Sequence, residues 1–180
     1  MKAGASTNAM PSEVEDLIRS TVQRIQSSGG TVVGLIGFSQ GTKVVAGLLK
    51  GAEIARALKE KGAVEGEDLY WCCWKFGISV CGSYPPPLLP PSVISALSSF
   101  SSLEKAEQEA LLHGKITTPT LHVQGNQYEW NLAGEALIKG FYETGEGKSV
   151  VKEWDMGHYY PTLPQESEEI AGWIKGAMAG

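Results

Sequence analysis

Residues 37–41 read Gly-Phe-Ser-Gln-Gly, a spacing that sets one serine between two glycines. The apolar run over residues 31–38 is typical of a buried strand, and apolar residues between 40 and 49 recur at helical spacing. A strand, G-x-S-x-G and a helix in this order predict a nucleophile elbow, a sharp turn that exposes the serine. We therefore expect Ser39 to be a nucleophile at a helix N-terminus, where amide N–H groups favour a developing negative charge.

A serine hydroxyl is a weak nucleophile and needs a nearby base, usually histidine. Of the three histidines, His113 lies in a polar stretch and His122 lies inside a strand pattern, which favours surface and structural roles. His158 follows the last predicted strand and precedes the last predicted helix, the place where α/β-hydrolases carry their base. We therefore expect His158 to be the general base.

Strand and helix patterns alternate along the rest of the chain. Helices are predicted over residues 13–26, 40–49, 53–61, 132–142 and 166–178, and strands over 31–38, 74–81, 120–125 and 149–154. Ser12 and Glu15 have the spacing of a capping box before the first helix. This alternation predicts one α/β domain over residues 1–180, a parallel sheet with flanking helices whose strands carry functional residues at their carboxyl ends.

Composition excludes several classes of function. The hydrophobic fraction is 42% and the charged fraction 19%, which indicates a globular chain, and the net charge of −5 without a basic cluster argues against nucleic acid as a partner. Three cysteines are a poor disulfide framework, and the first 11 residues lack the apolar core of a secretory signal, so we expect a cytoplasmic protein with no membrane span. Scattered histidines and the lack of a dinucleotide fingerprint predict no metal and no cofactor.

Residues 82–91 contain so many prolines that they favour stiff, extended backbone. We expect the uncharged segment around them to form a lid-like stretch over the site, residues 83–103. Its apolar side chains either line a pocket for a hydrophobic substrate or simply cover the sheet. The candidate substrate-binding residues are Phe38, Tyr84, Leu88, Leu89, Tyr128, Trp130 and Tyr159.

Four segments together resemble the FSH-type serine hydrolases, whose fungal members include stand-alone thioesterases that release polyketides from their synthases. The matching segments are Gly37-Phe38-Ser39-Gln40-Gly41-Thr42, Lys75-Phe76-Gly77 with Cys81-Gly82-Ser83-Tyr84-Pro85-Pro86, residues 119–125, and Gly157-His158-Tyr159-Tyr160-Pro161. They span nearly the whole chain in the family's order. The resemblance implies an α/β-hydrolase fold, Ser39 as nucleophile, His158 as base, the Gln40 N–H as an oxyanion donor, and acyl ester or thioester substrates.

The chain departs from the family at the position of the triad acid. In the family, an aspartate lies three residues after the glycine that closes the third strand, and this chain has Tyr128 there. A phenol is neutral near pH 7, so it cannot stabilise imidazolium as a carboxylate does. Glu129 beside it and Asp155 on the histidine's own loop are the candidate replacements, and the third alternative is that no acid replaces it.

The family's opening strand and Leu-His-Gly-like loop are also missing, which implies a truncated α/β-hydrolase fold. The missing loop normally supplies a second oxyanion donor, and losing one such donor costs about 10²–10³ in rate. Without the neighbouring strand, residues 31–38 become an exposed apolar edge, which templates pairing with another chain. We expect a homodimer or a partner subunit to cover this edge; the alternative is an incomplete gene product.

Three functions follow from these residues. The first is a serine hydrolase or thioesterase of fungal secondary metabolism that acts on a hydrophobic, polyketide-like ester, thioester or lactone. The second is a repurposed fold that catalyses cyclisation, isomerisation or elimination with His158 as base and without an acyl-enzyme. The third is a non-catalytic subunit. Hydrolysis requires Ser39, the rearrangement requires only His158, and the subunit requires neither.

Overall fold

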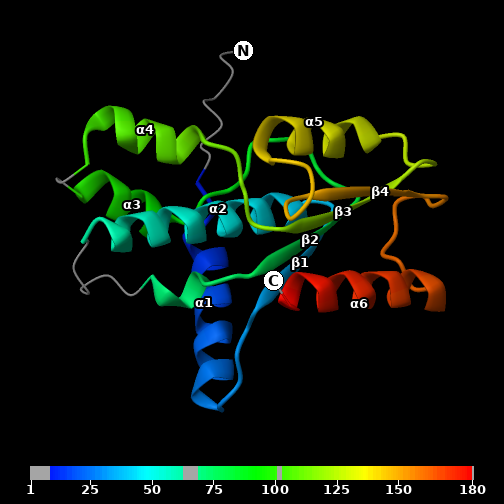
Figure 1. Cartoon of the computed structure of the whole chain (residues 1–180), viewed down its shortest axis with the longest axis horizontal. Helices are drawn as coiled ribbons and strands as arrows, with labels where there is room; N and C mark the ends of the chain where they lie inside the picture. The colour runs from blue at the N-terminus through cyan, green and yellow to red at the C-terminus, as the bar shows by residue number, and fades with distance from the viewer. Residues whose placement is uncertain (1–8, 63–68, 101–102, 180) are drawn as a thin grey trace.

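The computed structural model of the chain describes residues 9–62, 69–100 and 103–179. It contains a four-stranded parallel sheet in the order β1-β2-β3-β4, with helices on both faces (Figure 1). The strands are β1 (Gly34–Phe38), β2 (Phe76–Val80), β3 (Thr120–Gly125) and β4 (Val150–Trp154). The helices are α1 (Ser12–Ser27), α2 (Gly41–Glu60), the short 3₁₀ helix η1 (Tyr70–Cys72), α3 (Pro91–Ser99), α4 (Lys105–His113), α5 (Asn131–Phe141) and α6 (Pro164–Ala179). The predicted α/β class is confirmed.

The two faces of the sheet differ in the size of their side chains. One face presents large apolar residues to α6, and the Phe76 ring meets the Trp173 ring edge-on at 5.9 Å. On the opposite face lie Gly37 and Gly77, and a Cβ atom on either glycine would come within 3.3 Å of Val45 on α2. These glycines let α2 pack directly against the sheet. Figure 1 shows α6 on one side of the sheet and α2 with α5 on the other.

The predicted helices over residues 40–49 and 53–61 are one continuous helix, α2, whose middle is buried. The Glu53 carboxylate on α2 accepts hydrogen bonds of 2.7–2.9 Å from the backbone N–H and hydroxyl groups of Thr117 and Thr118. Lys50 lies 3.9 Å from the same carboxylate, and burial lowers the pKa of Lys50 while Glu53 opposes that shift. The start of β3 is thereby fixed to α2.

One local expectation, the capping box, is wrong. Pro11, not Ser12, is the N-cap of α1 and no side chain caps the helix. Glu15 instead accepts a hydrogen bond of 3.2 Å from the Ser92 N–H and a shorter one from the Ser92 hydroxyl, so it ties α1 to α3. The proline-rich segment contains no helix from residue 82 to residue 90, as expected, and α3 begins only at its last residue, Pro91, a favourable first helical residue.

Part of the predicted lid packs as core. Leu89, Val93 and Leu97 are buried against Ile54 and Leu58 of α2, which matches the covering alternative for these side chains. Residues 101 and 102 of the predicted lid lie outside the described residues.

Strand β1 lies at an edge of the sheet, and among the described residues it pairs only with β2. Its Ile36 side chain is 54% exposed on the α6 side of the sheet. The edge strand is shorter than the predicted run over residues 31–38, because the ladder begins at Gly34. Whether another chain covers this edge stays a prediction.

Candidate active site

Ser39 occupies a strained turn between β1 and α2, with a φ of +51°. A positive φ is uncommon for a residue with a side chain and is characteristic of a nucleophile elbow. The Ser39 N–H donates to the Val80 carbonyl at 3.0 Å, and its carbonyl accepts from the Thr42 N–H at 3.0 Å and the Thr42 hydroxyl at 2.6 Å. These hydrogen bonds hold the backbone on both sides of Ser39, while the half-buried serine stays accessible to solvent.

Gln40 caps the N-terminus of α2 and is exposed. Within the described part of the chain, neither its backbone N–H nor that of Gly41 has a hydrogen-bond partner. Unpaired N–H groups at the N-terminus of a 20-residue helix suit an anion next to Ser39. This geometry is compatible with the predicted oxyanion role of Gln40.

The exposed His158 ring lies between two aromatic rings. Its centroid is 4.8 Å from that of Phe38, with 24° between the planes, and 4.4 Å from that of Tyr128, with 12° between the planes. Because Phe38 directly precedes Ser39, the predicted base lies at the elbow. Among the described residues, no hydrogen bond joins the imidazole to Ser39 or to a carboxylate.

The two candidate acids have other partners. Asp155 accepts a hydrogen bond of 2.8 Å from the Gln127 side chain, and Glu129 accepts one of 3.0 Å from the Trp130 indole N–H. Tyr128, at the expected acid position, remains a neutral phenol: burial, followed by the charges of Cys81 and Glu129, raises its pKa. The structure therefore brings Tyr128 to His158 by stacking and brings neither carboxylate into hydrogen-bond contact.

Cys81 supports the histidine loop, a role that the sequence did not reveal. It follows β2 with a φ of +48°, and its buried thiol points toward the carbonyl oxygens of Gly157 at 3.6 Å and Tyr159 at 3.9 Å. Burial raises the pKa of this thiol. A buried cysteine at a strand end is typical of a small apolar core residue, and no local pattern in the sequence signals this contact.

Apart from the two rings that flank His158, the candidate substrate-binding residues divide into two groups. Tyr84 and Trp130 are each 51% exposed and meet edge-on at 6.3 Å, and Tyr159 is also exposed near His158. Leu89 is buried in the core, and the half-buried Leu88 packs against the cluster around α2. The aromatic residues therefore gather at the site, whereas the two leucines do not join them.

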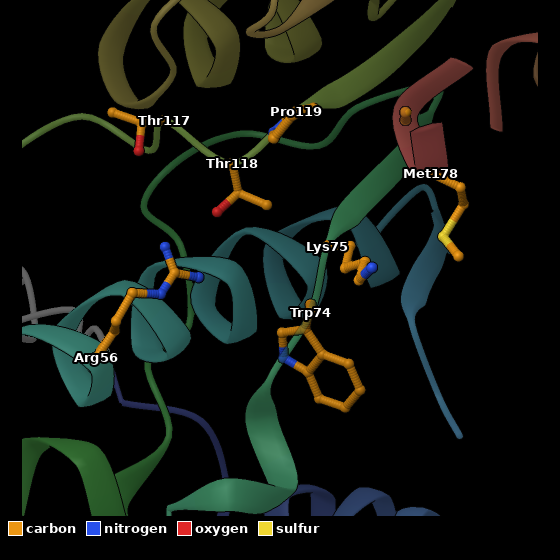
Figure 2. A pocket seen from close by; sticks show the side chains of 8 residues that line it. Arg56, Trp74, Lys75, Thr117, Thr118, Pro119 and Met178 are labelled. Carbon is orange, nitrogen blue, oxygen red and sulfur yellow. The ribbon is translucent and has the colours of Figure 1, made fainter. Parts of the chain in front are cut away.

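A cavity of about 380 Å³ lies at the other end of the sheet (Figure 2). It is lined by Arg56, Trp74, Lys75, Thr117, Thr118, Pro119, Ala177 and Met178. The segments before β2 and β3 contribute most of this lining, and Ser39 and His158 lie beyond the carboxyl ends of the strands. None of the predicted site residues lines this cavity, so it is separate from the candidate active site.

The described residues contain no group of three or more His, Cys, Asp or Glu side chains arranged to hold a metal ion. None of their helices is long and apolar enough to cross a bilayer.

Comparison with known families gives a match over most of the chain. The model of the family described as serine hydrolase (FSH1) matches residues 6–170. The probable esterase TOX9 of Cochliobolus heterostrophus is 28% identical over 166 residues, which cover 82% of this chain and 58% of that protein. Esterase citA of Monascus ruber is 28% identical, with 90% and 60% covered, and thioesterase FSL2 of Gibberella zeae is 24% identical, with 78% and 48% covered.

Solved structures show the same fold. Esterase B from Lactobacillus rhamnosis superposes with a TM-score of 0.52 at 16% identity, over 92% of this chain and 60% of that chain. Its tributyrin phosphonate-inhibited form gives a TM-score of 0.54 at 17% identity. The chain thus spans about half to three fifths of the length of the proteins that it resembles.

Proposed function

This chain belongs to the FSH1 family of serine hydrolases, and we propose that it hydrolyses hydrophobic esters, thioesters or lactones with Ser39 as nucleophile and His158 as base. The observation that carries the proposal is the elbow itself. Ser39 is held at a φ of +51° beside the unpaired N–H groups at the N-terminus of α2. The His158 ring stacks on Phe38, the residue before Ser39. A general base must lie near the proton that it accepts, and the hydrogen bond often forms only in the substrate complex.

The reaction proceeds through an acyl-enzyme. The Ser39 oxygen attacks the substrate carbonyl carbon as its proton moves to the imidazole of His158, and the Gln40 N–H donates to the resulting oxyanion. The intermediate collapses as the bond to the alcohol or thiol breaks and His158 returns the proton to that leaving group. Water then attacks the carbonyl carbon of the Ser39 ester as one of its protons moves to His158. The bond from that carbon to the Ser39 oxygen breaks, the acid is released, and His158 returns the proton to Ser39.

The exposed aromatic side chains support an apolar acyl group as the substrate. Exposed aromatic ring surface lies around the site, contributed by Tyr84, Trp130 and Tyr159. Such surface favours the binding of planar or apolar groups over small polar ones. The similar fungal proteins carry the names of esterases and a thioesterase. A polyketide-like acyl substrate of fungal secondary metabolism is consistent with both.

One observation favours a second function. Since His158 has no carboxylate partner among the described residues, the hydrolytic step lacks its usual support. A rearrangement that needs only proton abstraction from a substrate carbon by His158, with its return to another atom, makes fewer demands on Ser39.

Hydrolysis of p-nitrophenyl esters from acetate to dodecanoate distinguishes these functions, with Ser39→Ala and His158→Ala as matched variants. The hydrolase requires turnover that both substitutions abolish and that favours longer acyl chains. Turnover that survives in Ser39→Ala, or no turnover in the folded parent, would contradict it.

A further inference from the structure

We propose that the ring faces of Tyr128 and Phe38 take over from a triad carboxylate in orienting His158 and stabilising its protonated form. This inference rests on the proposed function and makes both aromatic residues positioning residues of the reaction. It starts from the sandwich in which the imidazole lies 4.4 Å from the Tyr128 ring and 4.8 Å from the Phe38 ring.

The two rings reach His158 from separate strands. Phe38 is the last residue of β1 and is held by its pairing with Val80. Tyr128 follows β3 in a turn, in which its N–H donates to the Gly125 carbonyl at 3.2 Å and its carbonyl accepts from the Asn131 N–H at 3.1 Å. Because both backbones are hydrogen-bonded and both side chains pack against the buried cluster under α6, the two rings form a slot that restricts the imidazole plane.

The slot suits the charge that appears during the reaction. When Ser39 attacks, His158 accepts a proton and becomes a cation between two π faces, each within about 6 Å, where aromatic rings attract cations. At exposed sites one such contact changes an equilibrium by a factor of about 2 to 5. The neutral imidazole lacks this attraction, so the interaction is stronger in the transition state than before it, which is the condition for catalysis.

The ring of Tyr128, rather than its hydroxyl, interacts with His158. The hydroxyl stays protonated at neutral pH, since burial and nearby negative groups raise the pKa of Tyr128. It accordingly carries no negative charge for the imidazolium. The ring face alone explains the contact, and Phe38, which has no hydroxyl, makes the same contact on the other side.

Substitutions at position 128 separate the ring from the hydroxyl. Tyr128→Phe keeps the ring and Tyr128→Leu removes it. The parameters kcat and KM are measured with p-nitrophenyl acetate, whose acetyl group offers little apolar surface for Tyr84, Trp130 and Tyr159 to contact. We expect Tyr128→Phe to retain the parent kcat and Tyr128→Leu to lower kcat about 5-fold at nearly constant KM. Phe38→Leu should act in the same direction.

Two controls keep the result specific. Tyr160 is exposed on the loop that carries His158, but it is not one of the two rings stacked on the imidazole. Tyr160→Leu should therefore leave kcat unchanged. The NMR shifts of the His158 ring protons report the stack directly: aromatic ring currents displace them, and Tyr128→Leu should remove part of that displacement while Tyr128→Phe keeps it. Melting temperatures show whether each variant is folded.

The outcomes are distinguishable. Ser39-dependent turnover in the parent that is equal in Tyr128→Leu and Tyr128→Phe would overturn the inference and leave the proposed function standing. A loss in Tyr128→Phe as large as in Tyr128→Leu would assign the effect to the hydroxyl and also overturn it. No Ser39-dependent turnover in the folded parent would contradict the proposed function, and the role of the rings with it.

Discussion

The buried hydroxyl of Thr42 accepts a hydrogen bond of 3.0 Å from the backbone N–H of Ser83. The same hydroxyl donates to the Ser39 carbonyl at 2.6 Å, so a single side chain links the elbow to the loop that follows β2. This link fixes the position of the nucleophile relative to Ser83 and the neighbouring Tyr84.

Thr42→Val should destabilise the fold by about 1–3 kcal/mol, because it leaves the half-buried Ser83 N–H without its partner. Urea unfolding measures the change in free energy. Thr42→Ser keeps the hydroxyl and serves as the control. A Thr42→Val variant as stable as the parent would show that the hydrogen bond is unimportant.

Gly47→Ala should destabilise the protein by about 1–3 kcal/mol or more, since its Cβ would lie 1.6 Å from the Leu88 carbonyl oxygen and force α2 away from the proline-rich segment. Gly172→Ala is the matched control on α6, where a Cβ meets nothing within 4 Å. Alanine there should stabilise the helix by up to about 1 kcal/mol. Thermal melts that shift in the same direction for both variants would contradict this packing.

His122 should make the fold sensitive to acid. It is fully buried, neither ring nitrogen has a hydrogen-bond partner among the described residues, and burial lowers the pKa of His122 to about 3. In the unfolded chain its pKa is about 6.5, so between these values the unfolded state binds a proton that the folded state does not. Stability is therefore complete above about pH 6.5 and falls as the pH decreases toward 3.

Urea unfolding of the parent and His122→Phe from pH 7.5 to 4.5 tests this dependence. Other groups also titrate in this range, so the difference between the two proteins is the informative quantity. The parent should lose up to about 1.4 kcal/mol more per pH unit than the variant. Parallel curves would mean that His122 is not the titrating group.

The exposed edge strand β1 leads to a prediction about assembly. We expect a second copy of the chain to cover it, because within the described ranges the outer side of β1 has no strand partner and Ile36 is exposed. Light scattering at micromolar concentration should show a dimer that Ile36→Lys dissociates. Val151→Lys, on the opposite edge strand β4, is the control and should leave it intact. A monomeric parent protein would contradict this prediction.

The sequence predicted features that depend on local patterns. The elbow could be read from the glycine spacing around Ser39, and the parallel sheet from alternating strand and helix patterns. The sequence did not reveal interactions between distant segments. Glu15 matches a capping box by spacing, yet in the fold its carboxylate accepts hydrogen bonds from Ser92 instead. Likewise, Pro91 ends an extended proline run in the sequence but begins α3, whose apolar face is buried against α2.

The site shows the same division. The positions of Ser39 and His158 follow from strand order, because parallel strands deliver their carboxyl ends to one edge. The aromatic sandwich depends on where the turn after β3 places Tyr128 relative to β1, a distance that no local pattern encodes. The support from Cys81 to the histidine loop depends on the same tertiary placement.

Covalent labelling by a fluorophosphonate probe, followed by intact-mass detection, tests the central assignment of Ser39 most directly. An activated serine attacks the phosphorus and displaces fluoride, so the folded parent should gain the mass of one phosphonyl group while Ser39→Ala gains none. Labelling of the parent and Ser39→Ala to the same extent, or no labelling of the folded parent, would contradict the assignment of Ser39 as the nucleophile.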